Sequence, residues 1–297
     1  MRIIQRLYAI DHLPTLPEIV LHVGQLLASG EGDARTLAAL IEEDMSLTAR
    51  VLQIANSVYF KPSDARISSV QRAVSHIGFV EVANIVTALS LLRSLPLGNT
   101  TLDYKELWRH SLTAAYLTRA IADASQVEFS IADRAHLFVA GLMHDIGILV
   151  YDQFFNKEFK VVVETASRHG VSYVETEQLL MGNETHAIVG SALLELWKMA
   201  IPVVSAVRFH HNPQKSPEKH KAITGVVSVA EFILCNWRIG SFEGALPEID
   251  TSILEVLGIS QSTLPDLFNI AITTVGTSDL ILSMNQPRTS QSELKSV

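Results

Sequence analysis

The 297-residue sequence contains a single cysteine, Cys235, which excludes disulfide bonds within the chain. So little cysteine is typical of a reducing compartment, and we expect a cytoplasmic protein. The sequence also has no excess of basic residues: 23 Lys and Arg stand against 31 Asp and Glu, a net charge of −8. A surface of that sign repels polyanions, so we expect no binding to nucleic acid.

Long uninterrupted apolar runs are missing too, although 48% of the residues are hydrophobic and the mean hydropathy is +0.25. A membrane-spanning helix needs about 20 apolar residues with few charges. Glu81 and Arg93 interrupt residues 79–95, and Asp145 lies near the centre of residues 137–155. We therefore predict that both segments are buried core helices and expect no association with a membrane. The first residues, MRIIQRLYAIDHLP, lack the sustained apolar stretch of a secretory signal.

Regular alternation of apolar and polar residues, which marks half-buried strands, is rare in this sequence. Helix signals recur instead, with start signals at Asp33, Asp44 or Ser46, Ser68 or Ser69, Ser172 and Pro202, and stop signals at Gly78, Pro96, Gly170 and Gly240. We therefore predict an all-α, multi-helix bundle. A polar stretch at 97–103 suggests a boundary between an N-terminal helical subdomain (1–100) and a second helical domain (101–285). Residues 286–297 are polar and predicted to be a disordered tail.

Histidine and acidic residues recur in the second half in a suggestive order: His110, the pair His144-Asp145, His186, and the pair His210-His211. Imidazole and carboxylate are typical ligands of divalent Fe, Mn, Ni or Zn. An aspartate buried in an apolar helix needs a partner, and a metal ion would supply one. The pattern therefore favours a metal site with one or two ions.

Each of these residues also has an ordinary structural interpretation. Asp145 could cap a turn before Gly147, and the pair His210-His211 could end a helix, where imidazolium suits the helix dipole. We assign no ligand role to the other histidines, which are His12, His22, His76, His136, His169 and His220. The sequence shows neither a GxSxG nucleophile elbow nor a phosphate-binding loop ending in GK[ST].

Several longer segments carry a family resemblance: LPTLPEIVLHVGQLL (13–27), LIEEDMSLTARVLQIANSVYF (40–60), ISSVQRAVSHIGFVEVANIV (67–86) and HAIVGSALLELWKMAIPVVSAVRFHHNP (186–213). The chain resembles HDOD proteins of bacteria from about residue 8 to residue 240. The second half is similar to the HD superfamily of metal-dependent phosphohydrolases, and the first half to the helical subdomain that distinguishes HDOD proteins. The resemblance implies an HD-like bundle preceded by an HDOD subdomain.

The resemblance also implies a ligand set for one or two divalent ions. The set comprises the six positions singled out above and Glu231: His110, His144, Asp145, His186, His210, His211 and Glu231. Glu231 stands where the superfamily has its final aspartate, and its extra methylene would displace the carboxylate. Asp145 would bridge the ions if two are bound, and it would be the catalytic carboxylate if the protein is an enzyme.

Two departures from the HD-GYP enzymes, which hydrolyse cyclic di-GMP, argue against that activity. Ile148 occupies the position of their lysine after HDIG, and the sequence HHNPQKSPEK lacks their GYP motif. Three interpretations remain open. The first is a signal-transduction protein with a structural or regulatory metal, which contacts signalling proteins. The second is an active phosphohydrolase acting on a nucleotide or other phosphoester. The third is an interaction domain that binds no metal.

Overall fold

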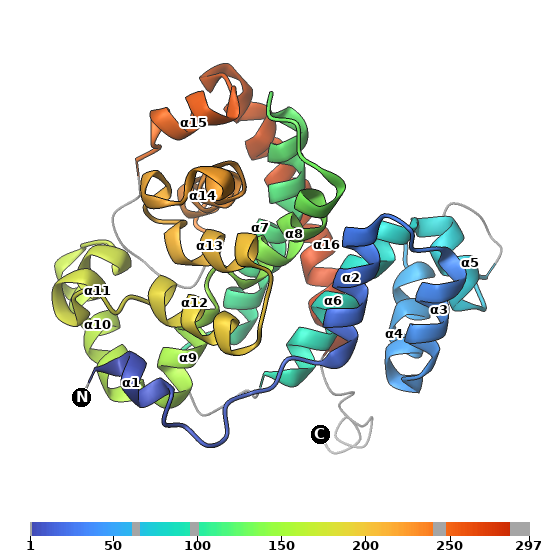
Figure 1. Cartoon of the computed structure of the whole chain (residues 1–297), viewed down its shortest axis with the longest axis horizontal. Coiled ribbons are helices and arrows are strands. Elements are labelled where there is room, and N and C mark those ends of the chain that lie inside the picture. Colours follow the sequence, from blue (N-terminus) through green and yellow to red (C-terminus); the bar gives the residue numbers. More distant parts are fainter. Residues whose placement is uncertain (1, 61–65, 96–100, 240–247, 286–297) are drawn as a thin grey trace, which may run out of the picture.

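The computed structural model describes residues 2–60, 66–95, 101–239 and 248–285, which form helices and no strand (Figure 1). This confirms the all-α prediction. The first half contains α1 (Ile3–Leu7), α2 (Glu18–Ser29), α3 (Ala34–Glu42), α4 (Met45–Ala55), α5 (Val70–Ile77) and α6 (Phe79–Ser94). The middle contains α7 (Tyr104–Ala124), α8 (Ile131–Met143), α9 (Ile146–Phe154), α10 (Asn156–His169) and α11 (Tyr173–Met181). The last part contains α12 (His186–Leu196), α13 (Ile201–Phe209), α14 (Lys221–Asn236), α15 (Thr251–Leu257) and α16 (Leu264–Asn285), with 3₁₀ turns η1 (Pro213–Lys215), η2 (Glu218–His220) and η3 (Gln261–Thr263).

Most of the expected helix starts carry the capping contacts that the sequence predicts. Asp33 accepts a hydrogen bond from the Thr36 amide, and of the alternatives for the next helix it is Asp44 that caps α4. Ser69 caps α5, and Ser172 caps α11. Such side-chain acceptors satisfy amides that have no partner within the helix.

The predicted helix ends are likewise confirmed where the structure describes them. α5 ends before Gly78, which has a φ of 102°, and α10 ends at Gly170 in the left-handed conformation. Pro202 lies in the first turn of α13. The stop signals at Pro96 and Gly240, part of the proposed boundary at 97–103, and the tail 286–297 lie outside the described residues.

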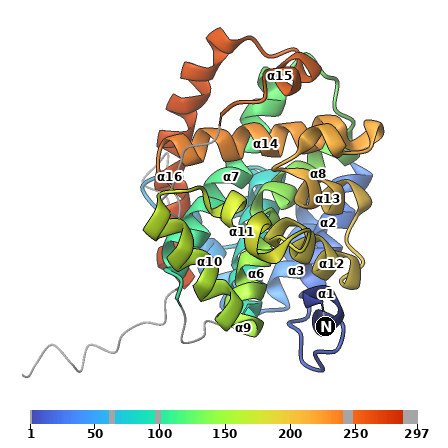
Figure 2. The same ribbon diagram turned by 90° about the vertical axis from the view of Figure 1, so that its left-hand side faces the viewer.

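The helices form two groups that lie side by side (Figure 1). α2 to α6 pack together, and α2 also packs against α8. The long helix α7 contacts α8, α14 and α16, and α16 reaches back to α6 and α4. Figure 2 shows α14 running across the bundle above α7 and α8. The domain limits predicted at residue 100 remain a prediction.

The N-terminal segment, residues 2–16, links the second group of helices to the first. Its helix α1 packs against α12, and the chain then runs along the edge of the molecule to α2 (Figure 1). The amides of Ile3 and Ile4 donate hydrogen bonds to the carboxylate of Glu184, at 2.9 and 3.1 Å. Farther along, the Trp197 indole donates to the Pro14 carbonyl at 2.7 Å. The segment is therefore attached near both ends of α12.

The two apolar segments judged from the sequence are buried, as predicted. Residues 82–92 of α6 and residues 137–152 of α8 and α9 lie in the core. Within the described residues, two helical stretches could cross a membrane by length and composition alone: Ile131–Phe154, with 89% of its most apolar window buried, and Gln261–Met284, with 28% buried. The bent pair α5 and α6 passes the same test only if it is counted as one span.

Candidate metal centre

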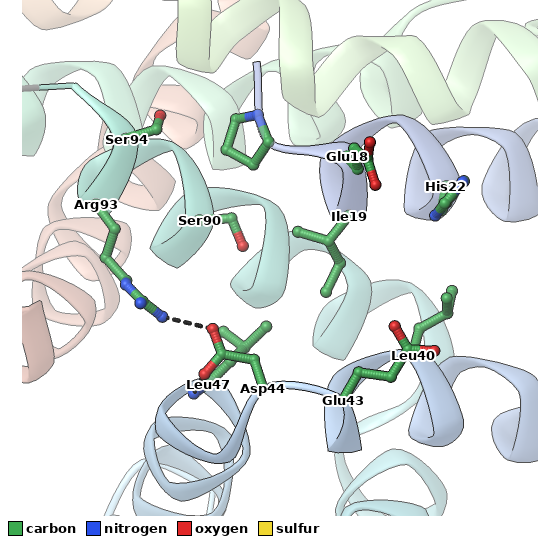
Figure 3. Close-up of a pocket in the computed structure, with 11 residues that line it drawn as sticks. Glu18, Ile19, His22, Leu40, Glu43, Asp44, Leu47, Ser90, Arg93 and Ser94 are labelled. Carbon is green, nitrogen blue, oxygen red and sulfur yellow. Dashed lines mark hydrogen bonds and ion pairs between the residues drawn. The ribbon is translucent and has the colours of Figure 1, made fainter. Parts of the chain in front are cut away.

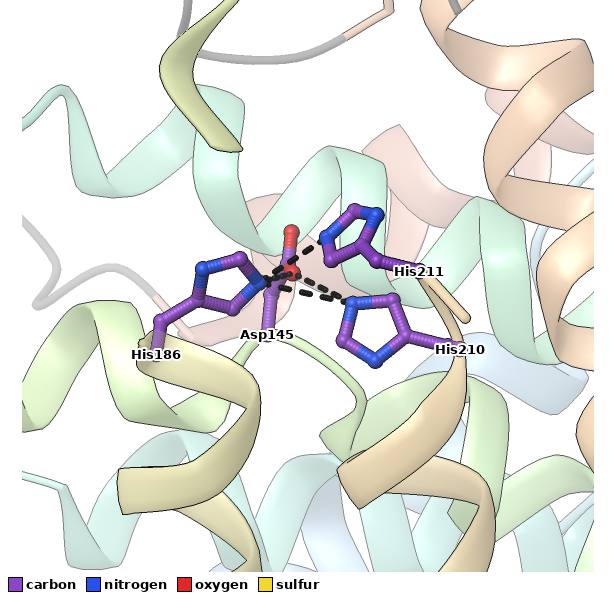
Figure 4. Close-up of side chains that lie close together, drawn as sticks. All are labelled: Asp145, His186, His210 and His211. Atoms are coloured by element: carbon purple, nitrogen blue, oxygen red, sulfur yellow. Dashed lines mark hydrogen bonds and ion pairs between the residues drawn. The ribbon is translucent and has the colours of Figure 1, made fainter. Parts of the chain in front are cut away.

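All seven candidate ligands meet at one place, where α7, α12 and α14 approach the α8–α9 junction and the end of α13. They form two donor sets that share Asp145. The first donor set is Asp145, His186, His210 and His211 (Figure 4). The second donor set is His110, His144, Asp145 and Glu231. Within each set the potential ligand atoms lie within 4.8 Å of one another.

Close helix packing, permitted by glycine, brings these side chains together. A Cβ atom at Gly141 would lie 2.8 Å from the Ala115 Cα atom, so α8 can approach α7 and place His144 near His110. A Cβ atom at Gly147 would overlap the backbone of His186. The glycine at the start of α9 therefore lets Asp145 lie beside the first residue of α12.

Asp145 directs a different oxygen toward each donor set. Its Oδ1 atom lies 3.4 Å from Nε2 of His186 and 3.6 Å from Nε2 of His210. Its Oδ2 atom lies 3.4 Å from Nε2 of His110 and 3.3 Å from Nε2 of His144. The side chain makes no capping bond at the start of α9, so the alternative role as a turn cap is not observed.

Glu231 reaches the cluster despite its extra methylene. Its Oε2 atom lies 2.9 Å from Nε2 of His110 and 3.3 Å from Nε2 of His144. The thiol of Cys235, one turn later on α14, donates to the other carboxylate oxygen at 3.0 Å. Burial, reinforced by the charge of Glu231, raises the pKa of this thiol well above its ordinary value, so the thiol keeps the proton that it donates.

The histidine rings are oriented by hydrogen bonds on the side away from the cluster. Nδ1 donates to a backbone carbonyl in three of them: His110 to Ile239 (2.6 Å), His144 to Gly141 (2.7 Å) and His210 to Val207 (2.7 Å). A carbonyl oxygen can only accept, so Nδ1 carries the proton and Nε2 is left facing the cluster. His210 and His211 come directly after the last residue of α13, so these two histidines end the helix and also face the cluster.

Glu177 on α11 is a functional candidate that sequence reasoning missed. This buried carboxylate accepts from Nδ1 and from the backbone amide of His186, each at 2.7 Å. Tyr173 donates to it from the preceding turn, at 3.3 Å. A carboxylate behind a ligand histidine fixes the ring and makes its free nitrogen a better donor. Nothing in the segment YVETEQLL distinguishes this residue from an ordinary helix glutamate.

Pairs of ring nitrogens face each other at hydrogen-bonding distance. Nε2 of His110 lies 3.0 Å from Nε2 of His144, and Nε2 of His211 lies 3.0 Å from Nε2 of His186. Two unprotonated nitrogens at that separation repel each other, so either one ring of each pair carries a proton there or a metal ion lies between the rings. Ligand atoms bound at about 2.1 Å to one ion lie about 3.0 to 3.4 Å apart, close to the spacing seen here. The donor chemistry and spacing therefore fit a divalent metal ion.

Without a metal ion, protons on the histidine rings balance the negative charge of the buried carboxylates. Burial by itself lowers the pKa of His186, but the carboxylates of Glu177 and Asp145 outweigh it and raise the pKa to about 10. Burial opposes charge on His144 in the same way, and Asp145 and Glu231 hold its pKa well above the ordinary value. Conversely, burial would raise the pKa of Asp145, but the imidazoles, led by His144, hold it well below its usual range.

His211 differs from these two histidines. Burial, assisted by electrostatic repulsion from His210 and His186, holds its pKa well below the ordinary value. It is therefore a neutral imidazole near neutral pH, which is the form that binds metal.

Comparison with known proteins identifies the family. The model of the HDOD domain matches residues 13–213, which include every candidate ligand except Glu231. The chain belongs to the HDOD domain family. An HDOD domain protein of unknown function from Geobacter sulfurreducens has a similar structure, with a TM-score of 0.80 and 27% identity, covering 93% of this chain and 96% of that one.

Two further relatives extend the comparison of this HDOD chain. A proposed phosphohydrolase from Shewanella amazonensis has a TM-score of 0.70 at 19% identity, with coverage of 95% and 97%, which shows a shared fold. An uncharacterised protein of Treponema pallidum is 26% identical over 252 residues, covering 84% of this chain and 47% of the relative. The chain thus spans about half the length of that relative.

Proposed function

We propose that this HDOD protein is a cytoplasmic signal-transduction protein whose second half would hold two divalent ions, one in each of the donor sets that share Asp145. The observation that carries the metal proposal is the division of the Asp145 carboxylate, with Oδ1 near the first donor set and Oδ2 near the second. Three histidines and a carboxylate suit borderline ions such as Fe, Zn or Ni, whereas two carboxylates in the second set also suit Mn.

The regulatory role is favoured by what surrounds the cluster. The HDOD subdomain adds helices that a plain HD enzyme lacks, and it packs on α8, which leads directly to His144. The position after HDIG is occupied by Ile148, which is buried and can hold no phosphate. The output would pass through contacts with signalling proteins, and the ions would hold α7, α12 and α14 in one arrangement around the α8–α9 junction.

A metal-dependent phosphohydrolase is the second candidate, favoured by the completeness of both donor sets. Bound divalent ions would supply positive charge to stabilise a phosphoryl group and would acidify a water molecule. The protein's own part would be positional. Asp145 would fix the spacing of the two sets, while Glu177 and Cys235 would hold His186 and Glu231 in place.

Turnover by metal-loaded protein separates the two candidates. The substrates would be bis(p-nitrophenyl) phosphate and p-nitrophenyl phosphate, with Asp145→Asn as the test variant and His136→Ala, a histidine outside the cluster, as its control. We expect metal binding by wild type without turnover above that of Asp145→Asn. Turnover that persists in His136→Ala but disappears in Asp145→Asn would establish the enzyme instead.

A further inference from the structure

A cavity of about 420 Å³ lies among helices of the HDOD subdomain and shares no lining residue with the metal centre (Figure 3). It is bounded by the start of α2, the α3–α4 junction and the last two turns of α6. Its apolar lining consists of Pro17, Ile19, Leu40 and Leu47. A cavity of this size lies within the range of small-ligand sites, which are mostly apolar with a few polar groups that fix orientation.

Ser90 directs its hydroxyl into this cavity. The residue is 8% exposed, and its oxygen points between the surrounding helices (Figure 3). No residue in the described part of the chain forms a hydrogen bond with this hydroxyl, whereas Ser94, one turn later, donates to the Leu91 carbonyl at 3.0 Å. A ligand in the cavity would hydrogen-bond to this hydroxyl in place of water.

The charged residues around the cavity determine which sign of charge the ligand should carry. Arg93 is the one lysine or arginine in the lining, and it forms an ion pair with Asp44 at 2.7 Å. Glu18 and Glu43 also line the cavity, are exposed, and have no ion-pair partner in the described structure. Two uncompensated carboxylates therefore remain in a chain that is already acidic, which favours a positively charged ligand.

We propose that this cavity binds a ligand with an apolar body and a positively charged amine or guanidine. The apolar body would lie against Ile19, Leu40 and Leu47, and the cation would lie near Glu18 and Glu43. Ser90 would hydrogen-bond to a polar group of the ligand. Such chemistry is offered by a free organic amine or by a lysine or arginine side chain of a peptide.

Methyl-resolved NMR of the whole chain tests this, with resonances of Ile19, Leu40 and Leu47 as reporters. The probes are hexylammonium as the free amine, N-acetyl-Leu-Lys-amide as the peptide form, and hexanoate as the anionic counterpart of the first. At low salt we expect at least one cationic probe to bind about tenfold more tightly than hexanoate, because two carboxylates act on the charge. Binding of hexylammonium alone indicates that the ligand is a free amine, and binding of the dipeptide alone indicates that it is a side chain of a peptide.

Variants show whether binding occurs at this cavity. The double variant Glu18→Gln/Glu43→Gln should remove the preference for the cation, whereas Glu42→Gln, an exposed acid that does not line the cavity, should retain it. Ser90→Leu should fill the space and abolish binding. The proposal is overturned if hexanoate binds as well as both cations, if no probe shifts these methyl resonances at millimolar concentration, or if the double variant keeps the preference.

Discussion

Gly147 packs directly against His186: a Cβ atom added at residue 147 would lie 1.9 Å from the carbonyl oxygen of His186. The neighbouring atoms belong to backbone, which cannot rotate away as a side chain can. The contact between α9 and α12 therefore depends on the absence of a side chain at this position. Gly147 lies two residues after Asp145, and His186 is the first residue of α12. The contact therefore also sets the distance between Asp145 and His186.

Gly147→Ala should therefore destabilise the protein and weaken metal binding together. Overpacking of a well-packed interior costs about 1–3 kcal/mol, which thermal or urea unfolding would measure. The control is Gly24→Ala in α2, where an added Cβ meets nothing within 4 Å. That change should be neutral or stabilise by about 0.5–1 kcal/mol, as expected for alanine replacing glycine within a helix. Equal stability of the two variants would refute the close-packing argument.

Glu177→Gln should lower metal affinity more than it lowers stability. The amide keeps the shape of the side chain and one acceptor for the His186 amide or ring, but it loses the negative charge behind the ring. Changes of this kind behind a ligand histidine cost about 10–100-fold in affinity. Competition with a chromophoric chelator would measure the metal affinity of the variant and of wild type. Glu175→Gln, on the exposed side of the same helix, should leave the affinity unchanged.

The pKa shifts in the cluster predict that metal affinity rises with pH. With the pKa of His186 raised to about 10 and that of His144 also raised, both rings hold protons at neutral pH in the metal-free protein. These protons must leave when Nε2 binds an ion. Isothermal titration in buffers of different ionisation enthalpy would count the protons released. Affinity that is constant from pH 6 to pH 9, with no proton release, would contradict this account.

The same shifts predict how stability of the metal-free protein changes with pH. A histidine whose pKa is higher in the folded than in the unfolded state stabilises the fold below its unfolded value, about 6.5. That contribution is lost as pH rises toward the folded value, which is about 10 for His186. Metal-free protein should therefore become less stable from pH 7 to pH 10. Metal-loaded protein should show a smaller change, because its rings are already deprotonated.

The N-terminal segment offers a separate test through Glu184. Its carboxylate accepts from the Ile3 and Ile4 amides at the start of α1, much as a capping residue does. Glu184→Ala should release α1 and cost about 1 kcal/mol, the typical value of a lost cap. Hydrogen exchange at residues 3–7 would show it directly. Glu164→Ala, at an exposed position on α10, should leave exchange there unchanged; protection that persists in Glu184→Ala would contradict the assignment.

Local signals made much of the fold predictable, because capping and helix termination depend on a few neighbouring residues. Asp33 and Ser69 cap their helices as expected, and Gly78 and Gly170 end theirs. The order of histidines, together with the family resemblance, predicted which residues meet. The sequence could not predict Glu177, because its role depends on α11 lying against the start of α12, a contact with no local signature. The cavity near Ser90 was unpredictable for the same reason.

Metal stoichiometry of protein purified without an affinity tag, and reconstituted anaerobically, tests the central claim most directly. Elemental analysis should find about two divalent ions per wild-type chain, as expected when two donor sets share one carboxylate. His110→Ala and His211→Ala should each retain about one, since each removes a ligand from only one donor set, whereas His144→Ala/Asp145→Ala should retain none. His136→Ala should match wild type. Absence of stoichiometric metal from folded wild-type protein would contradict the account and would leave a hydrogen-bonded histidine cluster held together by protons.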